Sequence, residues 1–358
     1  TDIHSADDVL RVLLLGVSLA VAAVPEGLPA VLSLVLAFGV QRMARNKAII
    51  KQLSSVETLG SASVICTDKT GTLTRSEMTI QQTMTASGKA AVSGVGYAPQ
   101  GQIHHQDQPM TCGPVHSENV LLLRGGSLAG NAALAQQEDG TWVIQGDPTE
   151  GAFLVAERKL DAPARSIERF ERVAEIPFTS DRKMMSALVI DHEHSDEQLL
   201  ISKGAPDVLL QHCTQVQVGM DGGPLTDDLR AKAVADVNEL SGAALRTLSV
   251  AYRPLATSED GAAGEALETG LIFIGTVGII DPPRKEVAPA ITEAHRAGIR
   301  IIMITGDHPR TATRIAEDLG IIQAGAAALT GADLDKLDDA ALAEAVKSNS
   351  VYARVAPS

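Results

Sequence analysis

SVICTDKTGTLT, residues 63–74, joins a short apolar run to a loop of small and hydroxyl side chains. The apolar run predicts a buried strand that ends at Asp68. A carboxylate at the carboxyl end of a parallel strand lies where open α/β sheets bind their ligands. The glycine and hydroxyl residues that follow allow backbone N–H groups to approach a phosphate closely. Asp68 is therefore a candidate nucleophile toward a phosphoryl group, which would form an aspartyl-phosphate.

The remaining strands of the sheet that Asp68 needs are predicted after residue 270. The predicted elements are a strand over Leu271–Ile280, a helix over about residues 285–297, a strand over Ile299–Ile304 and a helix after Asp307. Pro309 near the first turn and Gly320 at the end mark the bounds of the second helix. Alternating strands and helices indicate a doubly wound parallel sheet with right-handed crossovers. The α/β domain would thus be split by the residues between its two pieces.

Composition excludes several classes of protein. The 358 residues contain 30 Lys and Arg against 44 Asp and Glu, a formal net charge of −14 that argues against nucleic acid as a default partner. Hydrophobic residues at 45% and charged residues at 21% exclude a disordered chain. Cys66, Cys112 and Cys213 have no CxxC spacing, which excludes a disulfide scaffold and a zinc ribbon and fits a reducing compartment.

The segment from Val12 to Val40 contains a single ionisable residue, Glu26. As a helix it is long enough to cross a hydrocarbon core of roughly 30 Å with some tilt. A signal peptide fits poorly, because the run is too long and no small-residue cleavage site follows it. Acidic residues precede the segment and basic residues follow it, so the positive-inside tendency places the chain after about residue 41 in the cytoplasm.

The middle of this span, VAAVPEGLP at residues 21–29, predicts a broken helix. Pro25 and Pro29 each leave a carbonyl four residues back without its donor, and Gly27 weakens the helix further. Carbonyl oxygens and a carboxylate at mid-membrane depth favour a cation site, although a kinked span with Glu26 protonated or paired to another helix is the alternative. One helix cannot supply the six to eight oxygens that calcium takes, so further helices are expected. The predicted ligands are Val21, Ala22, Val24 and Glu26.

PEGLPA at residues 25–30 together with DKTGTLT at 68–74 resembles the P-type cation-transporting ATPases, and the resemblance covers essentially the whole chain. QRMA at 41–44 and SVETLG at 55–60 are similar to the calcium-pump branch, including bacterial members. Heavy-metal members carry a cysteine beside the membrane proline, where this chain has Val24 and Glu26. Sodium/potassium pumps tend to lack the second proline, which is present here as Pro29.

The resemblance implies a haloacid-dehalogenase-like phosphorylation domain, doubly wound and incomplete, that is split by an α+β nucleotide-binding insertion and preceded by one transmembrane helix. The implied segments are 1–60 for the membrane helix and a cytoplasmic connector that we expect to be helical, 61–77 and 271–358 for the phosphorylation domain, and 78–270 for the insertion. The insertion up to about Gln137 is rich in Gly, Ser, Gln and His, and we expect little regular structure there.

The resemblance also implies ATP and Mg²⁺ as cofactors, with a catalytic group of Asp68, Lys69 and Thr70. The Asp68 carboxylate and the Thr70 carbonyl would hold magnesium, and Thr305, Gly306 and Asp307 would hold the phosphate. Asp307 could also be a simple helix N-cap. Thr70 stands where related phosphatases have a second aspartate that acts as general acid and base. The phosphoenzyme should therefore hydrolyse slowly, as a pump requires and a phosphatase does not.

For the nucleotide, the resemblance implies Glu150, Phe178, Arg182, Lys203, Arg246, Asp281 and Arg284. Phe178 would stack on the adenine, as base–aromatic stacking allows, although an isolated Phe is more often a core residue. Lys203 could equally be a solvated turn residue. Asp147 or Thr149 could cap the helix that follows them, and Asp281 and Arg284 could belong to a capped helix start.

We therefore expect a fragment of an ATP-driven cation pump, a translocase of the calcium type, that is inactive by itself. The Gly-Asp-Gly-x-Asn-Asp loop, the actuator domain and the other helices of the family do not appear in the sequence. Expected partners are the transported cation, membrane lipid and those missing parts, in a multi-pass protein of the cell membrane. The alternatives are a non-catalytic nucleotide-binding membrane remnant, a pump for Mn²⁺, Na⁺ or H⁺, and a soluble phosphatase.

Overall fold

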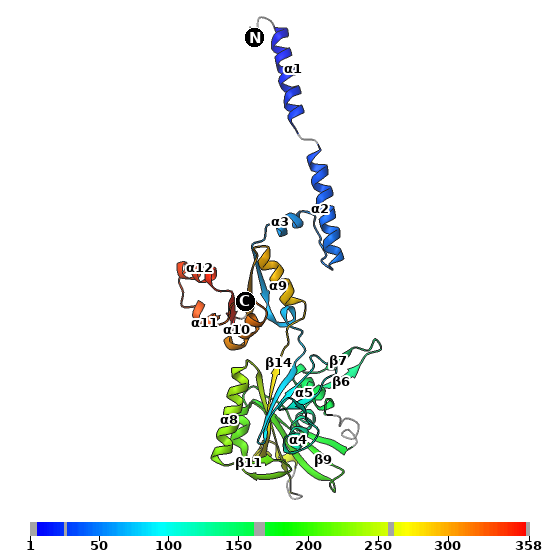
Figure 1. Ribbon diagram of the computed structural model, residues 1–358, viewed down its shortest axis with the longest axis vertical. Helices are drawn as coiled ribbons and strands as arrows, with labels where there is room; N and C mark the ends of the chain where they lie inside the picture. The colour runs from blue at the N-terminus through cyan, green and yellow to red at the C-terminus, as the bar shows by residue number, and fades with distance from the viewer. Residues whose placement is uncertain (1–5, 25–26, 161–168, 257–260, 356–358) are drawn as a thin grey trace. The chain divides into compact units, whose positions relative to one another are not determined.

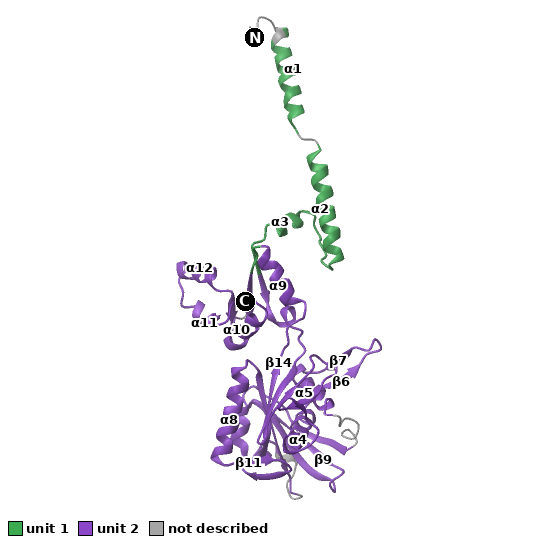
Figure 2. Cartoon of the chain, in the orientation of Figure 1, with its two compact units in different colours: residues 1–65, 298–300 green, residues 66–297, 301–358 purple. Residues whose placement is uncertain are grey.

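The computed structural model describes residues 6–24, 27–160, 169–256 and 261–355 (Figure 1). It divides into two compact units, coloured separately in Figure 2. The first comprises Thr1–Ile65 with Gly298–Arg300, and the second comprises Cys66–Ala297 with Ile301–Ser358.

The first unit is helical. Its helices are α1 (Ala6–Ala23), α2 (Leu28–Arg45) and α3 (Ser54–Gly60). The stretch Val9–Arg45 is long and apolar enough to cross a membrane by length and composition. The predicted connector is helical only in part, because α2 ends at Arg45 and no helix covers residues 46–53.

The predicted break in the span is confirmed, because α1 ends and α2 begins on either side of residues 24–27. Pro25 and Glu26 themselves lie outside the described residues. The Val21 carbonyl, expected to lack a donor, accepts from Val24 N at 3.1 Å. A carbonyl oxygen keeps a second lone pair, so this bond leaves Val21 available as a ligand.

The smaller sheet carries the DKTGTLT motif, with its strands in the order β1-β15-β17-β16. β15 pairs with β17, and β17 with β16, in parallel. The predictions of a strand before Asp68, of a strand before Thr305 and of the two helices around it are confirmed. The elements are β1 (Val64–Asp68), α9 (Val287–Arg296), β15 (Arg300–Thr305), α10 (Pro309–Asp318), β16 (Leu329–Thr330), α11 (Gly331–Leu334), α12 (Asp339–Ser348) and β17 (Val351–Ala353).

A larger sheet runs in the order β5-β4-β3-β2-β14-β13-β10-β9-β8, with β11 added beside β14 and β12 beside β11. The strands are β2 (Thr79–Thr85), β3 (Gly88–Val92), β4 (Ile103–His105), β5 (Gln108–Pro109), β8 (Phe170–Ile176), β9 (Met184–Asp191), β10 (Glu197–Gly204), β11 (Cys213–Val218), β12 (Asp221–Pro224), β13 (Arg246–Pro254) and β14 (Leu271–Ile280). β6 (Ala133–Gln136) and β7 (Trp142–Gln145) form a separate hairpin. The helices are α4 (Pro114–Leu128), α5 (Pro148–Arg158), α7 (Pro206–Leu209) and α8 (Asp227–Gly242).

The bounds of β14 agree with the prediction, but its expected place in the parallel sheet is wrong. β14 pairs antiparallel with β13 and β2 in the larger sheet. Nearly every residue of β14 is buried, because helices cover both faces of this sheet. A continuous apolar run is typical of a parallel strand buried on both sides, and the same pattern arises in this central strand, which is parallel only to the short strand β11. Hydrophobic periodicity therefore could not distinguish the two.

The expectation of little regular structure before Gln137 is also wrong. β2 pairs with β14 in the register Thr85↔Gly275, and β3 and β4 extend the sheet outward from it. The turns between these short strands use glycines with positive φ, such as Gly94 at 83° and Gly101 at 124°. The glycines that suggested irregular structure therefore form the turns of a sheet. The first strand of this segment, β2, pairs with β14, which is distant in sequence.

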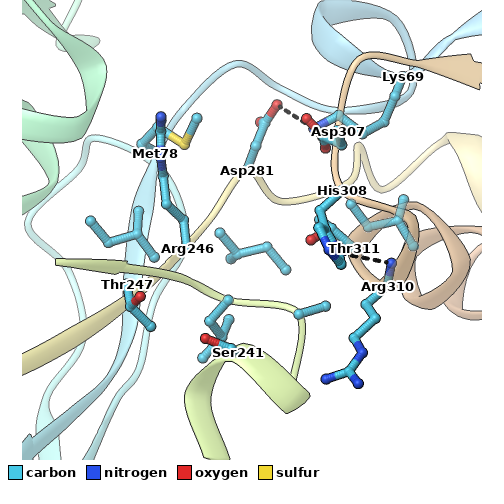
Figure 3. A pocket seen from close by; sticks show the side chains of 15 residues that line it. Lys69, Met78, Ser241, Arg246, Thr247, Asp281, Asp307, His308, Arg310 and Thr311 are labelled. Carbon is cyan, nitrogen blue, oxygen red and sulfur yellow. Dashed lines mark hydrogen bonds and ion pairs between the residues drawn. The ribbon is translucent and has the colours of Figure 1, made fainter. Parts of the chain in front are cut away.

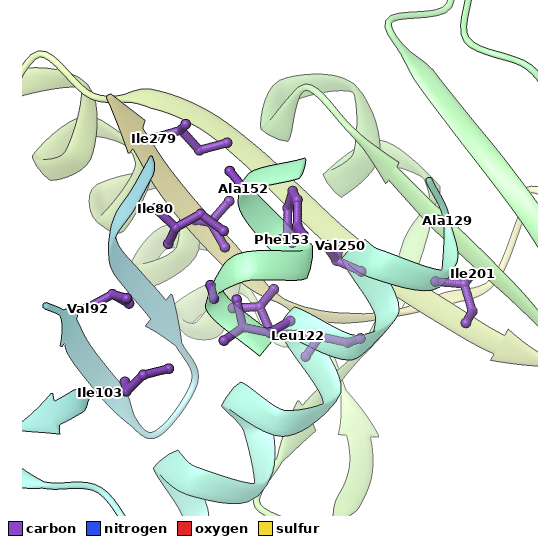
Figure 4. Close-up of a cluster of buried hydrophobic side chains, with 14 of the residues drawn as sticks. Ile80, Val92, Ile103, Leu122, Ala129, Ala152, Phe153, Ile201, Val250 and Ile279 are labelled. Atoms are coloured by element: carbon purple, nitrogen blue, oxygen red, sulfur yellow. The ribbon is translucent and has the colours of Figure 1, made fainter. Parts of the chain in front are cut away.

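The main core lies between α4, α5 and one face of the larger sheet (Figure 4). Leu122 and Phe153 from the two helices are fully buried against Ile80, Val250 and Ile274. Each such side chain contributes roughly 1.5–3 kcal/mol through burial. α8 contacts β13, β14 and β2, and it covers the opposite face (Figure 1). This packing fixes the strands whose ends carry the candidate site.

Candidate active site

The Asp68 loop leaves β1 as a tight turn. Asp68 lies at the end of the strand, and its Oδ1 accepts a hydrogen bond from Lys69 N at 2.8 Å. Residues Lys69–Leu73 then form a wide helical turn that is closed by Thr74 N donating to Lys69 O at 3.1 Å. Gly71 has a φ of 73°, which a glycine adopts at no steric cost. The backbone around Asp68 is thereby folded into a compact loop.

Arg284, the last residue of the segment DPPR at 281–284, holds this loop through hydrogen bonds. Its Nε donates to Thr74 O at 3.0 Å and its Nη2 donates to Gly71 O at 2.9 Å. Arg284 N also donates to Leu73 O at 2.9 Å, and Arg75 N donates to Pro282 O at 3.0 Å. The segment that follows β14 therefore holds the loop that follows β1, although about 210 residues separate them.

Lys69 joins the two segments electrostatically. Its ammonium lies 2.6 Å from Asp307 Oδ2 and 3.9 Å from Asp281 Oδ2, and only 5% of its side chain is exposed. Asp281 Oδ2 also accepts from Thr74 Oγ1 at 2.5 Å, while the buried Oδ1 has no hydrogen-bond partner among the described residues. Figure 3 shows Lys69, Asp281 and Asp307 on the same side of a cavity. The ends of β1, β14 and β15 thus meet in one place.

The TGD segment, residues 305–307, is held by the Thr305 hydroxyl and by Arg354, and Asp307 does not cap the following helix. Thr305 is buried, and its Oγ1 accepts from Asp307 N at 3.1 Å. Asp307 O accepts from Arg354 N, next to β17. The N-cap of α10 is His308, whose ring nitrogen accepts from Arg310 N at 3.3 Å. The Asp307 carboxylate is therefore free for its ion pair with Lys69, and the N-cap interpretation of Asp307 is wrong.

A cavity of about 720 Å³ opens beside this charged group (Figure 3). Lys69, Asp281 and Asp307 line it together with Arg246 at the start of β13 and Arg310 at the start of α10. A volume of this size suits a small-molecule ligand. Among the described residues, Asp68, Thr305 and Gly306 are not in its lining, so the structure brings only part of the predicted phosphate site to the cavity.

Lys203 forms a second charged group, in the larger sheet. It is 4% exposed, and its Nζ donates to Glu150 Oε1 at 3.1 Å and lies 5.6 Å from the centre of the Phe153 ring. Desolvation lowers the pKa of the Lys203 ammonium, and the Glu150 carboxylate opposes that shift. Glu150 Oε2 accepts from Asn131 N at 2.7 Å. The interpretation of Lys203 as a solvated turn residue is therefore wrong.

The Glu150 region begins with a capped helix. Asp147 is the N-cap of α5, and its side chain accepts from Thr149 N and Glu150 N. The capping interpretation of Asp147 is confirmed, and it leaves Glu150 free to contact Lys203.

Phe178 is 56% exposed in the turn between β8 and β9, so it is not a core residue. Close by, Arg182 binds the buried carboxylate of Glu268 through its Nη2. Sequence reasoning missed Glu268, which belongs to no motif and becomes recognisable only through its partners. It also gave no separate role to Thr74, the last residue of DKTGTLT, whose hydroxyl donates to Asp281 Oδ2.

The residues of the Asp68 loop fit a magnesium ion. Asp68 supplies a carboxylate at a strand end, and Thr70 supplies a backbone carbonyl from an extended conformation two residues later. Carboxylate and carbonyl oxygens are the ligands that magnesium takes in proteins.

Comparisons with known proteins support a common family. The family model described as P-type ATPase, cytoplasmic domain N, matches residues 119–286, and that of haloacid dehalogenase-like hydrolases matches residues 242–348. A calcium-transporting ATPase of Bacillus subtilis is 40% identical over 98% of this chain and 39% of its own length. A cation-transporting ATPase of Synechocystis is 39% identical over 95% of this chain and 38% of its own length, and a calcium-transporting ATPase of Listeria monocytogenes is 35% identical over 98% and 38%.

The chain therefore spans about two fifths of the length of the curated relatives it matches. Their similarity continues through both units of the structure, across the DKTGTLT loop and the TGD segment. Two family models and relatives at 35–40% identity agree, and they show that the chain belongs to the P-type ATPase family.

Proposed function

We propose that this chain carries the phosphorylation and nucleotide-binding parts of an ATP-driven cation pump, and that Asp68 is its phosphorylated residue. The observation that carries the proposal is the buried contact of Lys69 with Asp307 and Asp281. This contact brings together the ends of β1, β14 and β15, and Asp68 is the last residue of β1. The family membership supports the same reaction.

In the proposed reaction, a carboxylate oxygen of Asp68 attacks the γ-phosphorus of ATP. The bond from that phosphorus to the β–γ bridging oxygen breaks, and ADP leaves with the electron pair. Lys69 offsets negative charge at the loop, and the Thr305, Gly306 and Asp307 segment binds the transferring phosphoryl group. Magnesium, held by Asp68 and Thr70, would neutralise charge on the phosphate oxygens. Because Thr70 offers no acid or base, the aspartyl-phosphate should persist.

The larger sheet would bind the nucleotide. Phe178 is exposed and available to stack on adenine, as a base-binding aromatic must be. Lys203 and Glu150 form a fixed polar wall, and Arg246 lines the cavity beside Asp281 and would bind the phosphates. Arg284 donates to the Gly71 carbonyl and Arg182 to the Pro177 carbonyl, so we propose that they act by holding loops.

The transported cation would bind at the break between α1 and α2. Glu26 and the carbonyls of Val21, Ala22 and Val24 are the proposed ligands, completed by other membrane helices of a multi-pass protein whose residues after about 41 face the cytoplasm. Calcium is the proposed cation, since several relatives bear the name calcium-transporting ATPase. An actuator domain is a further proposed partner.

The test uses membranes that contain the protein expressed from its complete gene. Incubation with ATP labelled at the γ-phosphate, Mg²⁺ and micromolar Ca²⁺ should give an acid-stable, hydroxylamine-sensitive label on the protein. Asp68→Asn should abolish the label, whereas Asp335→Asn, at an exposed aspartate distant in sequence, should retain it. A label that survives Asp68→Asn refutes the assignment.

The same assay separates the alternatives. ATP binding without any label in the parent protein would favour the non-catalytic remnant, and rapid release of inorganic phosphate from small esters would favour a phosphatase. Replacing Ca²⁺ by Mn²⁺, Na⁺ or a lower pH tests the choice of cation. Glu26→Gln should raise the Ca²⁺ concentration that is needed for half-maximal label, and an unchanged requirement contradicts the proposed ion site.

A further inference from the structure

A buried carboxylate lies between the turn Gly261–Leu267 and β14. Glu268 is 2% exposed, and both of its carboxylate oxygens lie 2.5 Å from Arg182 Nη2. Its Oε1 also accepts from Ser186 Oγ, in β9, at 2.5 Å. Sequence motifs assign Glu268 no role, yet it is one of the few acidic residues that are buried in the described part of the chain. A buried carboxylate is retained at low cost only when charged and polar donors satisfy it, as they do here.

Arg182 connects the Glu268 carboxylate to the turn that contains Phe178. While its Nη2 binds Glu268, its Nη1 donates to Pro177 O at 2.9 Å. Pro177 is the residue directly before Phe178. Arg182 N also donates to Thr179 Oγ1 at 3.3 Å, on the other side of Phe178. The Arg182 guanidinium therefore holds the backbone before Phe178, and the Arg182 backbone N–H holds the Thr179 side chain after it, on either side of an aromatic ring that is itself exposed.

The same carboxylate is linked to the strand that carries Lys203. Ser186 Oγ lies 2.7 Å from Ser202 Oγ, and both serines are fully buried. Ser202 precedes Lys203 in β10, where Lys203 binds Glu150. Glu268 thus connects the Phe178 turn to β10, the strand that contains Lys203.

We propose that Glu268 is a positioning residue of the nucleotide site, which acts through Arg182 to hold the Phe178 turn in its binding conformation. This inference rests on the proposed binding of an adenine nucleotide by the larger sheet. An exposed aromatic ring on a loose turn must be ordered when a base binds, and that ordering reduces affinity. A charge-assisted ion pair with a buried acid orders the turn in advance.

The binding test is a double-mutant cycle on the detergent-solubilised protein, with MgATP titrated calorimetrically. We expect Glu268→Gln and Phe178→Ala each to weaken binding about tenfold. The double variant should be no more than about twofold weaker than the weaker single variant, because both changes remove the same contact. Effects that multiply to about a hundredfold would overturn the proposal. Glu265→Gln, at an exposed acid 3.3 Å from Arg182 Nε, is the matched control and should change binding less than about twofold.

Arg182→Lys provides a second variant if Glu268→Gln fails to fold. It keeps the positive charge beside Glu268 but loses the second arm that reaches Pro177 O. We expect the same loss of affinity and the same non-additivity with Phe178→Ala. At saturating ATP the amount of phosphoenzyme should equal that of the parent, because the residue acts on binding. A lower plateau would overturn a purely positioning role.

Hydrogen exchange without nucleotide makes the inference independent of the pump assignment. Glu268→Gln should speed exchange of the amides in residues 178–183, while amides in the centre of β14 keep their protection. Unchanged exchange in residues 178–183 would overturn the proposal. If those amides respond and Asp68 is never labelled, the proposed function fails and the positioning role of Glu268 stands.

Discussion

Lys69 and Asp307 offer the sharpest test of how the strand ends are held together. The perturbation is a cycle of Lys69→Met, Asp307→Asn and the double variant. Lys69→Met keeps most of the side-chain volume and removes the charge, and Asp307→Asn keeps the shape and removes the charge. Each change acts on the contact between the loop after β1 and the end of β15.

The geometry sets the magnitude. Unit charges 2.6 Å apart attract by about 6 kcal/mol at an effective dielectric constant of about 20, and the 3.9 Å contact with Asp281 adds about 4 kcal/mol. Desolvation of Lys69 and the 32% exposure of the Asp307 side chain reduce this gain, so we expect a coupling of about 1–3 kcal/mol. Asp307→Asn leaves the ammonium beside Asp281 and should therefore cost less than Lys69→Met.

Native-state hydrogen exchange of two loop amides measures the opening free energy. Thr74 N is bonded to Lys69 O, and Arg75 N is bonded to Pro282 O, so both are protected only while the loop is closed. Each single variant should lower their protection, and the double variant should lower it by less than the sum. A coupling below about 0.5 kcal/mol would refute the conclusion that this ion pair holds the strand ends.

Three further changes test other parts of the structure. Gly126→Ala should destabilise the larger sheet by about 1–3 kcal/mol, because the added Cβ would lie 2.1 Å from the buried ring of Phe153; urea unfolding followed by Trp142 fluorescence measures the loss, and parental stability would contradict the packing. Burial lowers the pKa of Lys159 to about 8 from 10.5, so between these pH values the unfolded state binds more protons and the free energy of unfolding rises with pH. Lys159→Met should remove that rise, and equal changes in urea midpoint between about pH 7.5 and pH 10 in both proteins would contradict it. Arg284→Met should speed amide exchange in residues 71–75, since its guanidinium binds two loop carbonyls, and unchanged exchange would show that the clamp is dispensable.

Local signals were sufficient for the elements around the DKTGTLT loop. The apolar run before Asp68, the proline at the start of α10 and the mostly apolar run of β14 each define an element without reference to the rest of the chain. The break between α1 and α2 follows from two prolines and a glycine for the same reason. Such patterns act within a few residues, so the sequence alone predicts them.

Pairings between distant segments were not predictable in this way. β14 has the apolar composition of a parallel strand because helices cover both of its faces, yet it lies between β2 and β13 and pairs antiparallel with both. The short strands before Gln137 form because β14 gives β2 a partner about 190 residues away in the chain.

The candidate functional residues show the same difference between local sequence signals and contacts made by distant segments. The sequence by itself identified the candidate reactive residues, since an aspartate at a strand end in DKTGTLT and a TGD segment are the residue types that the proposed phosphoryl chemistry requires. Only the tertiary structure decided their partners: Lys69 with Asp307, Lys203 with Glu150, and Arg182 with Glu268. A buried charge needs an opposite charge within a few ångströms, and the residue that supplies it is chosen by how the strands pack.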